Sequence, residues 1–548
     1  MLNNNHQIKL TQNYGFQWLV YSKDNIEIWF KGFAFYEESF LELSNLVDLV
    51  LPIVDNSSWD KLSELIKNMN GSFALVIKTE QVIVAAVDRL RSIPLFYGEH
   101  QNILYLSDDA HWVREKVRDT EMNDLNVTEF LLTAYVTGQE TLFPNLKQIQ
   151  AGEILLAKQH SDLLKIDTQR YYRFIHGNYF DASEEELCSL MDTMLLGVFQ
   201  RLLKSIGNRT VVIPLSGGYD SRLIVTMLKR LGKENVICFS YGRKGNWEAN
   251  ISKQVADTLG YPWYFVPYSR QSWYEWFNSE EMTIYYKYAT GLTSLAHLQD
   301  WAAVWKLKQD NKIPNDAVFV PGHSGDFVGG SHIPREFEYK SKISEQRLIE
   351  NIWKKHYSLW DWSKYFNHLS LPLKNRILSH LSDFSFDSGE NAASAFECWD
   401  WQERQAKFIV NSVRIYEFWD YEWRIPLWDY EMMEFWERVP LNLRIGKKLY
   451  DFYSETIFKK YKVNYSLDDI WNRSIIKISS YFHRFFDVWK CGAFEINPYF
   501  PFKKITDSKK LADYNHFLID YDQYIFMTRN NGILSLYHLN DICKETKN

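Results

Sequence analysis

The chain has few of the features that mark secreted proteins, membrane proteins or proteins with structural metal sites. Its five cysteines are odd in number and scattered, and no two form a C-x-x-C pair, so the sequence predicts neither a disulfide framework nor a zinc site. The longest apolar runs, such as residues 82–87, are far shorter than a membrane span, and none is expected. No basic segment followed by an apolar one opens the sequence, which argues against a secretory signal. We therefore expect a cytoplasmic protein.

Basic residues are not in excess either. The 62 Lys and Arg residues are outnumbered by 69 Asp and Glu residues, and a nucleic-acid partner would need a basic stripe. A length of 548 residues, 46% of them apolar, is enough for two or three domains. The numerous aromatic residues, including 21 Trp, are interpreted as the core of a large helical part rather than as a sugar-binding surface.

One segment carries most of the functional information. Residues 211–215 form a short β-branched apolar run, which predicts a buried strand, and Ser-Gly-Gly-Tyr-Asp-Ser follows at 216–221 before an amphipathic helix. Two glycines allow a tight turn whose backbone N–H groups point into one concavity beside a helix N-terminus, an arrangement that binds phosphate. It is not a Walker A loop, because no Gly-Lys-Ser/Thr follows. An ordinary strand–turn–helix junction is the alternative.

A carboxylate stands inside this loop. Asp220 lies among the expected phosphate donors, where the role that fits an acidic side chain is a ligand for the Mg²⁺ that accompanies a nucleotide. A later strand also breaks into glycines, and Asp326 is the carboxylate of that second loop. Strands at 236–240 and 263–267, with helices between them, predict a doubly wound parallel sheet, whose ligands bind beyond the carboxyl ends of the strands. We expect Asp220 and Asp326 to share one Mg²⁺ at that edge.

The chain divides into two parts around this sheet. The first part shows short strands with interspersed helices, which is typical of a layered α+β domain. A connection at 160–182 leads to the helix start Asp-Ala-Ser-Glu-Glu-Glu. We predict an N-terminal domain at 1–160 and a second domain at 183–548, with a helical insertion at about 345–410.

Further blocks follow one another in a fixed order. In the second domain they are the Ser-Gly-Gly loop, the glycine loop around Asp326, Glu-Trp-Arg-Ile-Pro-Leu-Trp-Asp and a pair of lysines, at residues 216–221, 322–330, 422–429 and 447–450. In the first domain they are Asn-Gly-Ser-Phe-Ala, Asp-Arg-Leu-Arg-Ser-Ile-Pro-Leu-Phe-Tyr and Thr-Leu-Phe with a later glycine, at residues 70–74, 88–97, 141–143 and 152. Together they resemble the blocks of the asparagine synthetase (glutamine-hydrolysing) family over roughly residues 65–460.

The resemblance implies both a fold and an activity. The fold is an α+β N-terminal Ntn-hydrolase-like layered domain, followed by an α/β doubly wound parallel-sheet ATP pyrophosphatase domain (adenine nucleotide α-hydrolase-like) with helical insertions. The activity is that of an ATP- and Mg²⁺-dependent, AMP-forming carbon–nitrogen ligase. A substrate carboxylate attacks the α-phosphate of ATP, pyrophosphate leaves, and ammonia or an amine displaces AMP from the acyl-adenylate.

The resemblance also assigns roles to matching positions. The nucleotide and its pyrophosphate would be bound by Ser216, Gly217, Gly218, Asp220, Ser221, Ser240, Gly322 and Gly325. Asp220 and Asp326 would be the Mg²⁺ ligands. Lys447 would neutralise charge on the phosphates or on the forming adenylate, its alternative being a solvated lysine at a helix start. His323 stands where other members carry Glu or Tyr, and it is either a general base near neutral pH or a loop residue that makes one hydrogen bond.

One departure concerns the source of nitrogen. Glutamine-dependent members use an N-terminal Cys as nucleophile, whereas here residue 2 is Leu and no cysteine precedes Cys188. We therefore expect the first domain to be a degenerate scaffold without glutaminase activity. The nitrogen would come from free ammonia, from a separate glutaminase or from an amine on the substrate.

The substrate stays open between several alternatives. Polar and basic residues at 239–248 and 331–335 favour an anionic, hydroxylated acid. The resemblance adds that similar proteins occur beside polysaccharide genes, and we therefore favour amidation of a sugar acid in surface-polysaccharide biosynthesis. Lasso-peptide cyclases and β-lactam synthetases also lack the terminal Cys, so intramolecular ring closure is an alternative. A non-catalytic scaffold is a third, although the retained aspartates and Lys447 argue against it.

Overall fold

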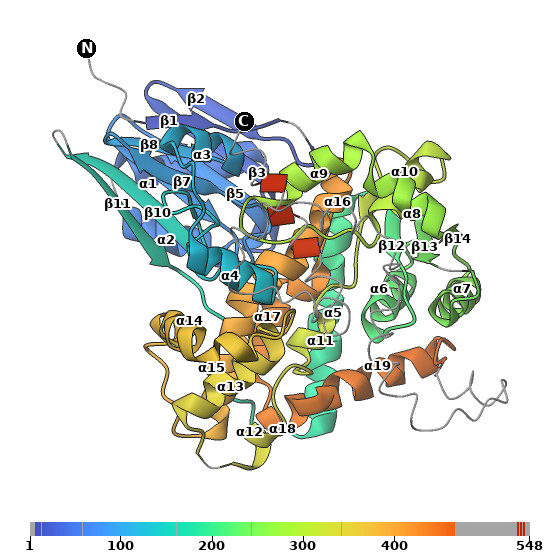
Figure 1. Cartoon of the computed structure of the whole chain (residues 1–548). Helices are drawn as coiled ribbons and strands as arrows, with labels where there is room; N and C mark the ends of the chain where they lie inside the picture. Colours follow the sequence, from blue (N-terminus) through green and yellow to red (C-terminus); the bar gives the residue numbers. More distant parts are fainter. Residues whose placement is uncertain are drawn as a thin grey trace.

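The computed structural model describes residues 6–465, apart from 13, 57, 161–162, 243 and 341, together with 534–535, 538–539 and 541–542. Within these residues a β-rich N-terminal part lies against a second part, in which helices surround a parallel sheet (Figure 1). None of the described helices is long and apolar enough to cross a membrane.

Two sheets form the N-terminal part. The larger is antiparallel, with the strand order β11-β10-β6-β5-β3-β2 and β4 paired to β3, and the smaller has the order β1-β8-β7-β9. The strands are β1 His6–Lys9, β2 Leu19–Lys23, β3 Ile26–Tyr36, β4 Ser39–Phe40, β5 Asn70–Lys78, β6 Val82–Val87, β7 Phe96–His100, β8 Ile103–Ser107, β9 Lys147–Gln148, β10 Glu153–His160 and β11 Leu163–Arg170. The helices of this part are α1 Leu43–Asp55, α2 Trp59–Asn68, α3 Ala110–Val117 and α4 Asp124–Thr133.

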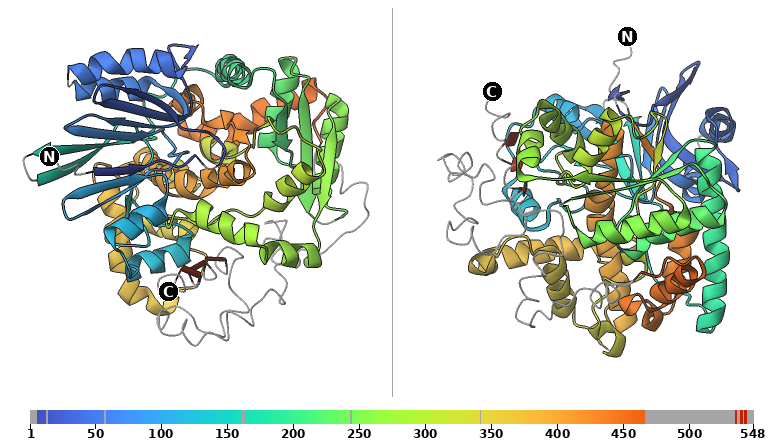
Figure 2. Two further views of the ribbon diagram at one scale, coloured as in Figure 1. Left: turned by 90° about the horizontal axis from the view of Figure 1, so that it is seen from above. Right: turned by 90° about the vertical axis from the view of Figure 1, so that its right-hand side faces the viewer.

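Burial on both faces of the larger sheet explains the layers. In β5, Phe73 and Leu75 pack into a core with the apolar sides of α1 and α2, while Ala74 and Val76 join the main core that includes the smaller sheet. Successive side chains of a strand point to opposite faces, so this alternation buries both of them. Helices α1 and α2 cover the outer face (Figure 2). This is the layered α+β arrangement that the sequence predicts.

The second part is built on a five-stranded sheet. Its order is β14-β13-β12-β15-β16, and every neighbouring pair is parallel, which confirms the predicted doubly wound sheet. The strands are β12 Val211–Pro214, β13 Val236–Gly242, β14 Trp263–Pro267, β15 Val318–Phe319 and β16 Glu422–Trp423. Because β12 pairs with β13 on one side and with β15 on the other, the winding reverses between β12 and β15. Ligands bind in such sheets beyond the strand ends at this reversal.

Helices make up most of the remaining described residues. The first, α5, begins with a capping box in which Ser183 and Glu186 satisfy each other's backbone N–H groups. The helices are α5 Glu184–Ile206, α6 Tyr219–Arg230, α7 Trp247–Leu259, α8 Arg270–Phe277, α9 Glu280–Thr290, α10 Trp301–Gln309, α11 Gly325–Val328, α12 Glu336–Tyr339, α13 Glu345–His356, α14 Phe366–His380, α15 Gly389–Asp400, α16 Arg414–Phe418, α17 Tyr430–Arg438, α18 Leu441–Arg444 and α19 Lys448–Lys460. The 3₁₀ helices are η1 Ser363–Tyr365, η3 Val410–Val413, η4 Pro426–Trp428 and η5 Ile445–Lys447, and η2 Trp401–Ile409 is a π-helix.

Helix η2 ties the two parts together. It is a π-helix of nine residues that continues α15. The fully buried ammonium of Lys407 donates to the carbonyls of Val136 and Gly138 in the N-terminal part, at 2.7 Å each, and ion-pairs with Glu403. The Glu403 carboxylate in turn accepts from the backbone N–H of Gly138 at 3.1 Å. Burial lowers the pKa of Lys407 to about 8, although Glu403 opposes the shift.

Removing the buried cation tests this connection. Lys407→Met is expected to lower the free energy of unfolding by about 3–5 kcal/mol, because Glu403 would remain buried without its partner. The double variant Glu403→Gln/Lys407→Met removes both charges and should recover part of the loss. Equilibrium denaturation of the three proteins measures both effects. A Lys407→Met protein as stable as the unmodified chain would contradict the connection.

Candidate active site

The loop after β12 is held by its own serines. The backbone N–H of Ser216 donates to Ser221 Oγ at 3.0 Å, the two hydroxyls lie 3.1 Å apart, and the N–H of Gly218 donates to Ser216 Oγ at 3.2 Å. Helix α6 then begins at Tyr219 without a side-chain cap on its first turn. Uncapped N–H groups and the helix dipole favour an anion at such an N-terminus. The loop therefore has the form that the sequence predicts for phosphate binding.

The loop after β15 packs directly on the first one. A Cβ atom at Gly322 would lie 2.6 Å from the backbone nitrogen of Ser221, and one at Gly325 would lie 2.5 Å from Cγ of Asp220. Both distances are too short for any other residue, so glycine at these positions is what lets the loops touch. The backbone N–H of Asp326 donates to Asp220 Oδ2 at 3.1 Å across this contact. The two predicted carboxylates therefore meet at the reversal of the sheet.

Each carboxylate has a different electrostatic environment. Burial raises the pKa of Asp220 to about 6, with the nearby charge of Asp326 adding to the effect and Lys447 opposing it. Burial also acts on Asp326, but a hydrogen bond from His332 and the positive charges of His332, Arg404 and Lys447 hold the pKa of Asp326 well below its usual range. Asp326 is therefore ionised throughout the neutral range, and about half of its side chain is exposed.

Half-exposed Asp326 is hydrogen-bonded to charged groups that are themselves buried. His332 Nε2 lies 3.1 Å from Asp326 Oδ2, and the other ring nitrogen of His332 bonds to Asp400 at the end of α15. Despite its burial, the pKa of His332 is raised, because carboxylates lie on both sides of the ring. A protonated imidazole donates to both, so His332 orients Asp326. The sequence analysis placed His332 in a substrate-binding stretch and did not identify Asp400.

Lys447 approaches the other carboxylate. Its ammonium lies 3.9 Å from Asp220 Oδ1 and 3.4 Å from Asp451 Oδ1, over the ring of Tyr450. The Tyr450 hydroxyl donates to Asp220 Oδ1 at 2.9 Å, a contact that the sequence analysis missed. Lys447 and Gly446 both have left-handed backbone conformations, which turn the chain into α19 beside Asp220. The structure thus places Lys447 in the predicted site.

His323 lies deeper than its loop position suggests. Its ring bonds to the Ser412 hydroxyl at about 3.1 Å, and burial, together with the neighbouring His297, lowers the pKa of His323 to about 3. The imidazole is therefore neutral and weakly basic at physiological pH. This favours the interpretation of His323 as a hydrogen-bonding residue over the general base.

A cavity of about 660 Å³ opens over the two loops. The predicted residues that line it are Ser216, Gly218, Asp220, Ser221, Gly322, His323, Asp326 and Lys447. Arg404 and Phe408 of η2 line it too, and the sequence analysis did not single them out. Gly217 and Gly325 lie just outside, against Trp247 and Asp220.

Two further predictions concern Ser240 and Arg243. The Ser240 hydroxyl donates to the carbonyl of Leu215 at 2.7 Å and accepts from Trp263 Nε1 at 3.1 Å. It connects three adjacent strands of the sheet and is absent from the cavity lining, so its geometry favours a structural role over nucleotide binding. Arg243, part of the stretch that favoured an anionic substrate, lies outside the described residues.

Comparisons with known proteins agree with this arrangement. Residues 203–461 match the family model described as asparagine synthase, and residues 57–172 match the glutamine amidotransferase domain. A probable asparagine synthetase [glutamine-hydrolyzing] of Acanthamoeba polyphaga mimivirus is 27% identical over 264 residues, which cover 45% of this chain and 44% of that protein. The chain thus spans less than half the length of the curated relative that it matches.

Among solved structures, an NH3-dependent NAD synthetase from Campylobacter jejuni is 16% identical, covering 37% of this chain and 84% of its own, with a TM-score of 0.19. A glutamine phosphoribosylpyrophosphate amidotransferase from B. subtilis is 13% identical, covering 48% and 75%, with a TM-score of 0.18. TM-scores this low do not establish a shared fold by themselves.

The two family matches fall on the two parts of the fold. The glutamine amidotransferase match covers much of the layered N-terminal part, and the asparagine synthase match contains the five strands of the parallel sheet and both glycine loops. The fold is therefore an Ntn-like glutamine amidotransferase domain followed by a parallel-sheet domain of the adenine nucleotide α-hydrolase type. The chain is thus similar to the asparagine synthase family over residues 203–461 and to the glutamine amidotransferase domain over residues 57–172.

Proposed function

We propose that this chain is an ATP-dependent, AMP-forming amide synthetase. The observation that carries the proposal is the meeting of Asp220 and Asp326 beside the Ser-Gly-Gly loop and the N-terminus of α6. Phosphate-binding N–H groups and paired carboxylates at one strand-end edge suit a nucleotide and its divalent cation. The family match supports the same reaction class.

The carboxylate pair fits Mg²⁺ that arrives with the nucleotide. Among the described residues no cluster of three His, Cys, Asp or Glu side chains is placed to hold a metal, so a cage made by the protein alone is not indicated. Mg²⁺ is bound through one or two carboxylates plus substrate phosphates, which is what Asp220 and Asp326 would supply. Charge neutralisation at the phosphates is the chemistry the ion would provide.

The side chains then divide the reaction between them. The loop at 216–221 and the start of α6 hold the leaving pyrophosphate, and Lys447 offsets negative charge as the substrate carboxylate oxygen bonds to the α-phosphorus. The bond from that phosphorus to the pyrophosphate oxygen breaks, leaving an acyl-adenylate. A nitrogen nucleophile next attacks the acyl carbon, AMP departs, and an amide remains. Neutral His323 accepts or donates one hydrogen bond beside this centre.

The lack of cysteine in the first domain bears on the source of the nitrogen. No cysteine occurs among residues 1–187, so that domain has no thiol for attack on glutamine. We propose that ammonia, the product of a separate glutaminase or an amine on the substrate is used. We propose this activity for the whole protein and expect it to act in the cytoplasm.

For the acid substrate we propose a chemical class. A sugar acid amidated in surface-polysaccharide biosynthesis remains our preference, but His332 no longer supports it because its ring is bonded to Asp326 and Asp400. Ring closure of the lasso-peptide or β-lactam type is the second candidate, since it needs no external nitrogen. A non-catalytic scaffold is disfavoured by the phosphate loop, the paired aspartates and Lys447 occurring together in one cavity.

The adenylation step is tested by ATP–pyrophosphate exchange. Asp220→Asn is expected to reduce exchange by about 10²–10³-fold, because it removes the charge that we assign to Mg²⁺ binding. Candidate acids are uronic acids, their nucleotide-linked forms, amino acids and peptides. The exposed Asp167→Asn serves as the matched control and should keep full exchange. Exchange that is unchanged in Asp220→Asn would refute the site.

The nitrogen proposal is tested with glutamine alone. Purified protein incubated with glutamine, with and without ATP and an active acid, should release no glutamate above the spontaneous rate. Ammonium chloride should support amide formation if the amine is external. Enzyme-dependent glutamate release would overturn the assignment of the first domain as a scaffold.

A further inference from the structure

A small cavity between the two parts of the fold lies apart from the candidate active site. It has a volume of about 20 Å³ and shares no lining residue with the larger cavity over the glycine loops. The charged residues that line it are Lys31, Arg91 and Asp108 of the N-terminal part and Arg414 of the second part. Three cations and one carboxylate give the lining an excess of positive charge where the two parts meet.

Arg91 is the cation of this cavity that has no counter-charge. The residue is only 4% exposed, and within the described part of the chain its guanidinium forms neither a hydrogen bond nor an ion pair. Its Nε atom, that of Arg414 and the hydroxyl of Thr290, another lining residue, are all buried without a hydrogen-bond partner among the described residues. Buried charges in proteins are normally paired, and a guanidinium has five N–H donors to satisfy. An anion is therefore missing beside Arg91.

The carboxylate in the lining is already engaged. Asp108 accepts hydrogen bonds from Lys31 Nζ at 3.3 Å and from Trp18 Nε1 at 2.9 Å. Arg414 in turn ion-pairs with Glu417 at 2.6 Å. These contacts balance two of the three cations, so the uncompensated charge of the cavity is that of the remaining arginine.

Two further carboxylates act on Arg91 through their charge, but neither pairs with it. Asp88 accepts from backbone N–H groups of its own turn, and Glu403 ion-pairs with Lys407. Burial, together with the positive charge of Arg414, lowers the pKa of Arg91 to about 9, and both carboxylates oppose the shift. The guanidinium is therefore protonated at neutral pH, and these carboxylates do not supply its hydrogen-bond partners.

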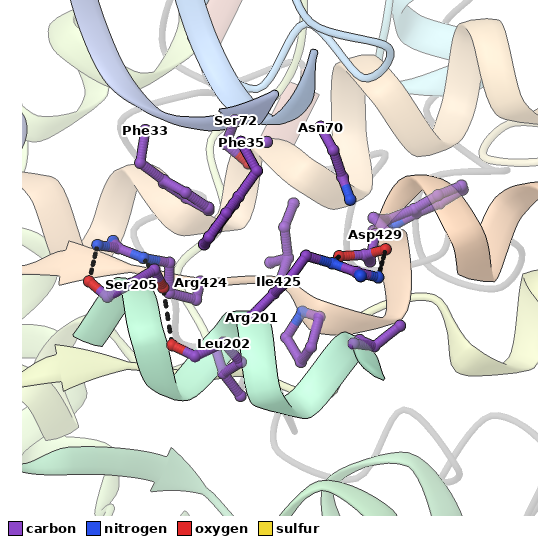
Figure 3. A pocket seen from close by; sticks show the side chains of 14 residues that line it. Phe33, Phe35, Asn70, Ser72, Arg201, Leu202, Ser205, Arg424, Ile425 and Asp429 are labelled. Carbon is purple, nitrogen blue, oxygen red and sulfur yellow. Dashed lines mark hydrogen bonds and ion pairs between the residues drawn. The ribbon is translucent and has the colours of Figure 1, made fainter. Parts of the chain in front are cut away.

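Another small pocket between the two parts shows the usual arrangement. In that pocket (Figure 3), Arg201 ion-pairs with Asp429 at 2.8 Å, and Arg424 ion-pairs with Glu422 at 3.0 Å. Each of these buried arginines has a carboxylate of the protein itself as its partner. The contrast supports a partner for Arg91 that comes from solution.

We propose that this cavity binds one halide ion, which bridges the two parts of the fold next to Arg91. A volume of about 20 Å³ has room for one or two atoms of the size of water, so a monatomic anion fits and a phosphate does not. A halide accepts hydrogen bonds from N–H and O–H donors in any direction, and Arg91 and Thr290 offer both kinds from opposite parts. Because the ion binds the folded chain and not the unfolded one, it stabilises the protein by mass action. The site takes no part in the proposed reaction.

Thermal unfolding in two salts tests the site in solution. Sodium chloride is compared with sodium isethionate, whose anion is too large for the cavity, at equal ionic strength so that general charge screening is the same. In the unmodified protein chloride should raise Tm by about 2–4 °C above the value in isethionate, and the difference should grow with the logarithm of the chloride concentration, as for one bound ion. Arg91→Met should abolish this difference, Arg91→Lys should keep part of it, and the exposed Arg347→Met should keep all of it.

Bromide locates the ion directly. Anomalous diffraction from crystals of the unmodified protein soaked in sodium bromide should show one ion within hydrogen-bond distance of Arg91 and Thr290. This measurement decides the question even if Arg91→Met fails to fold. A cavity without bromide, or with bromide but without chloride-specific stabilisation in solution, would overturn the inference, and so would a chloride effect that Arg91→Met leaves unchanged.

Discussion

The structure depends on the contact between two glycine loops. Each follows a strand at the point where the parallel sheet reverses its winding, and Gly322 and Gly325 leave no side chain between them. The contact lets the backbone of Asp326 bind the side chain of Asp220, which brings two carboxylates together in a partly buried place. Such a pair is electrostatically costly by itself, and a divalent cation with phosphate would relieve it.

Neighbouring side chains hold the carboxylates of Asp220 and Asp326 in place. Lys447 and Tyr450 approach Asp220, whereas His332, supported by Asp400, holds Asp326. The Tyr450 hydroxyl, three residues after Lys447, contacts the first carboxylate directly.

The N-terminal part contributes to the site through η2. Its loop at 136–138 binds Glu403 and Lys407, and the next residues along η2 hold Gln405 against Ser324 of the second glycine loop. Stability of the domain contact and the shape of the cavity are linked by the same nine-residue helix.

Local patterns made the strands and glycine loops predictable, because β-branched runs and Ser-Gly-Gly act within a few residues. Contacts between residues far apart in the sequence were not predictable. Asp400 reaches His332 from 68 residues away, and Arg404 lies in no motif. The two-residue strand β16 is too short to show a pattern. Burial, which the sequence does not display, changed the interpretation of His323 and of Ser240.

Nucleotide affinity in a loop-contact variant tests the central claim most directly. Gly325→Ala adds one methyl group where Asp220 and Tyr450 leave no space, while Gly177→Ala adds it where no atom lies within 4 Å. Titration of ATP with Mg²⁺ into both folded variants should show affinity close to that of the unmodified protein for Gly177→Ala and a loss of at least about tenfold for Gly325→Ala. Equal affinity in the two variants would contradict the claim that the loop contact forms the nucleotide site.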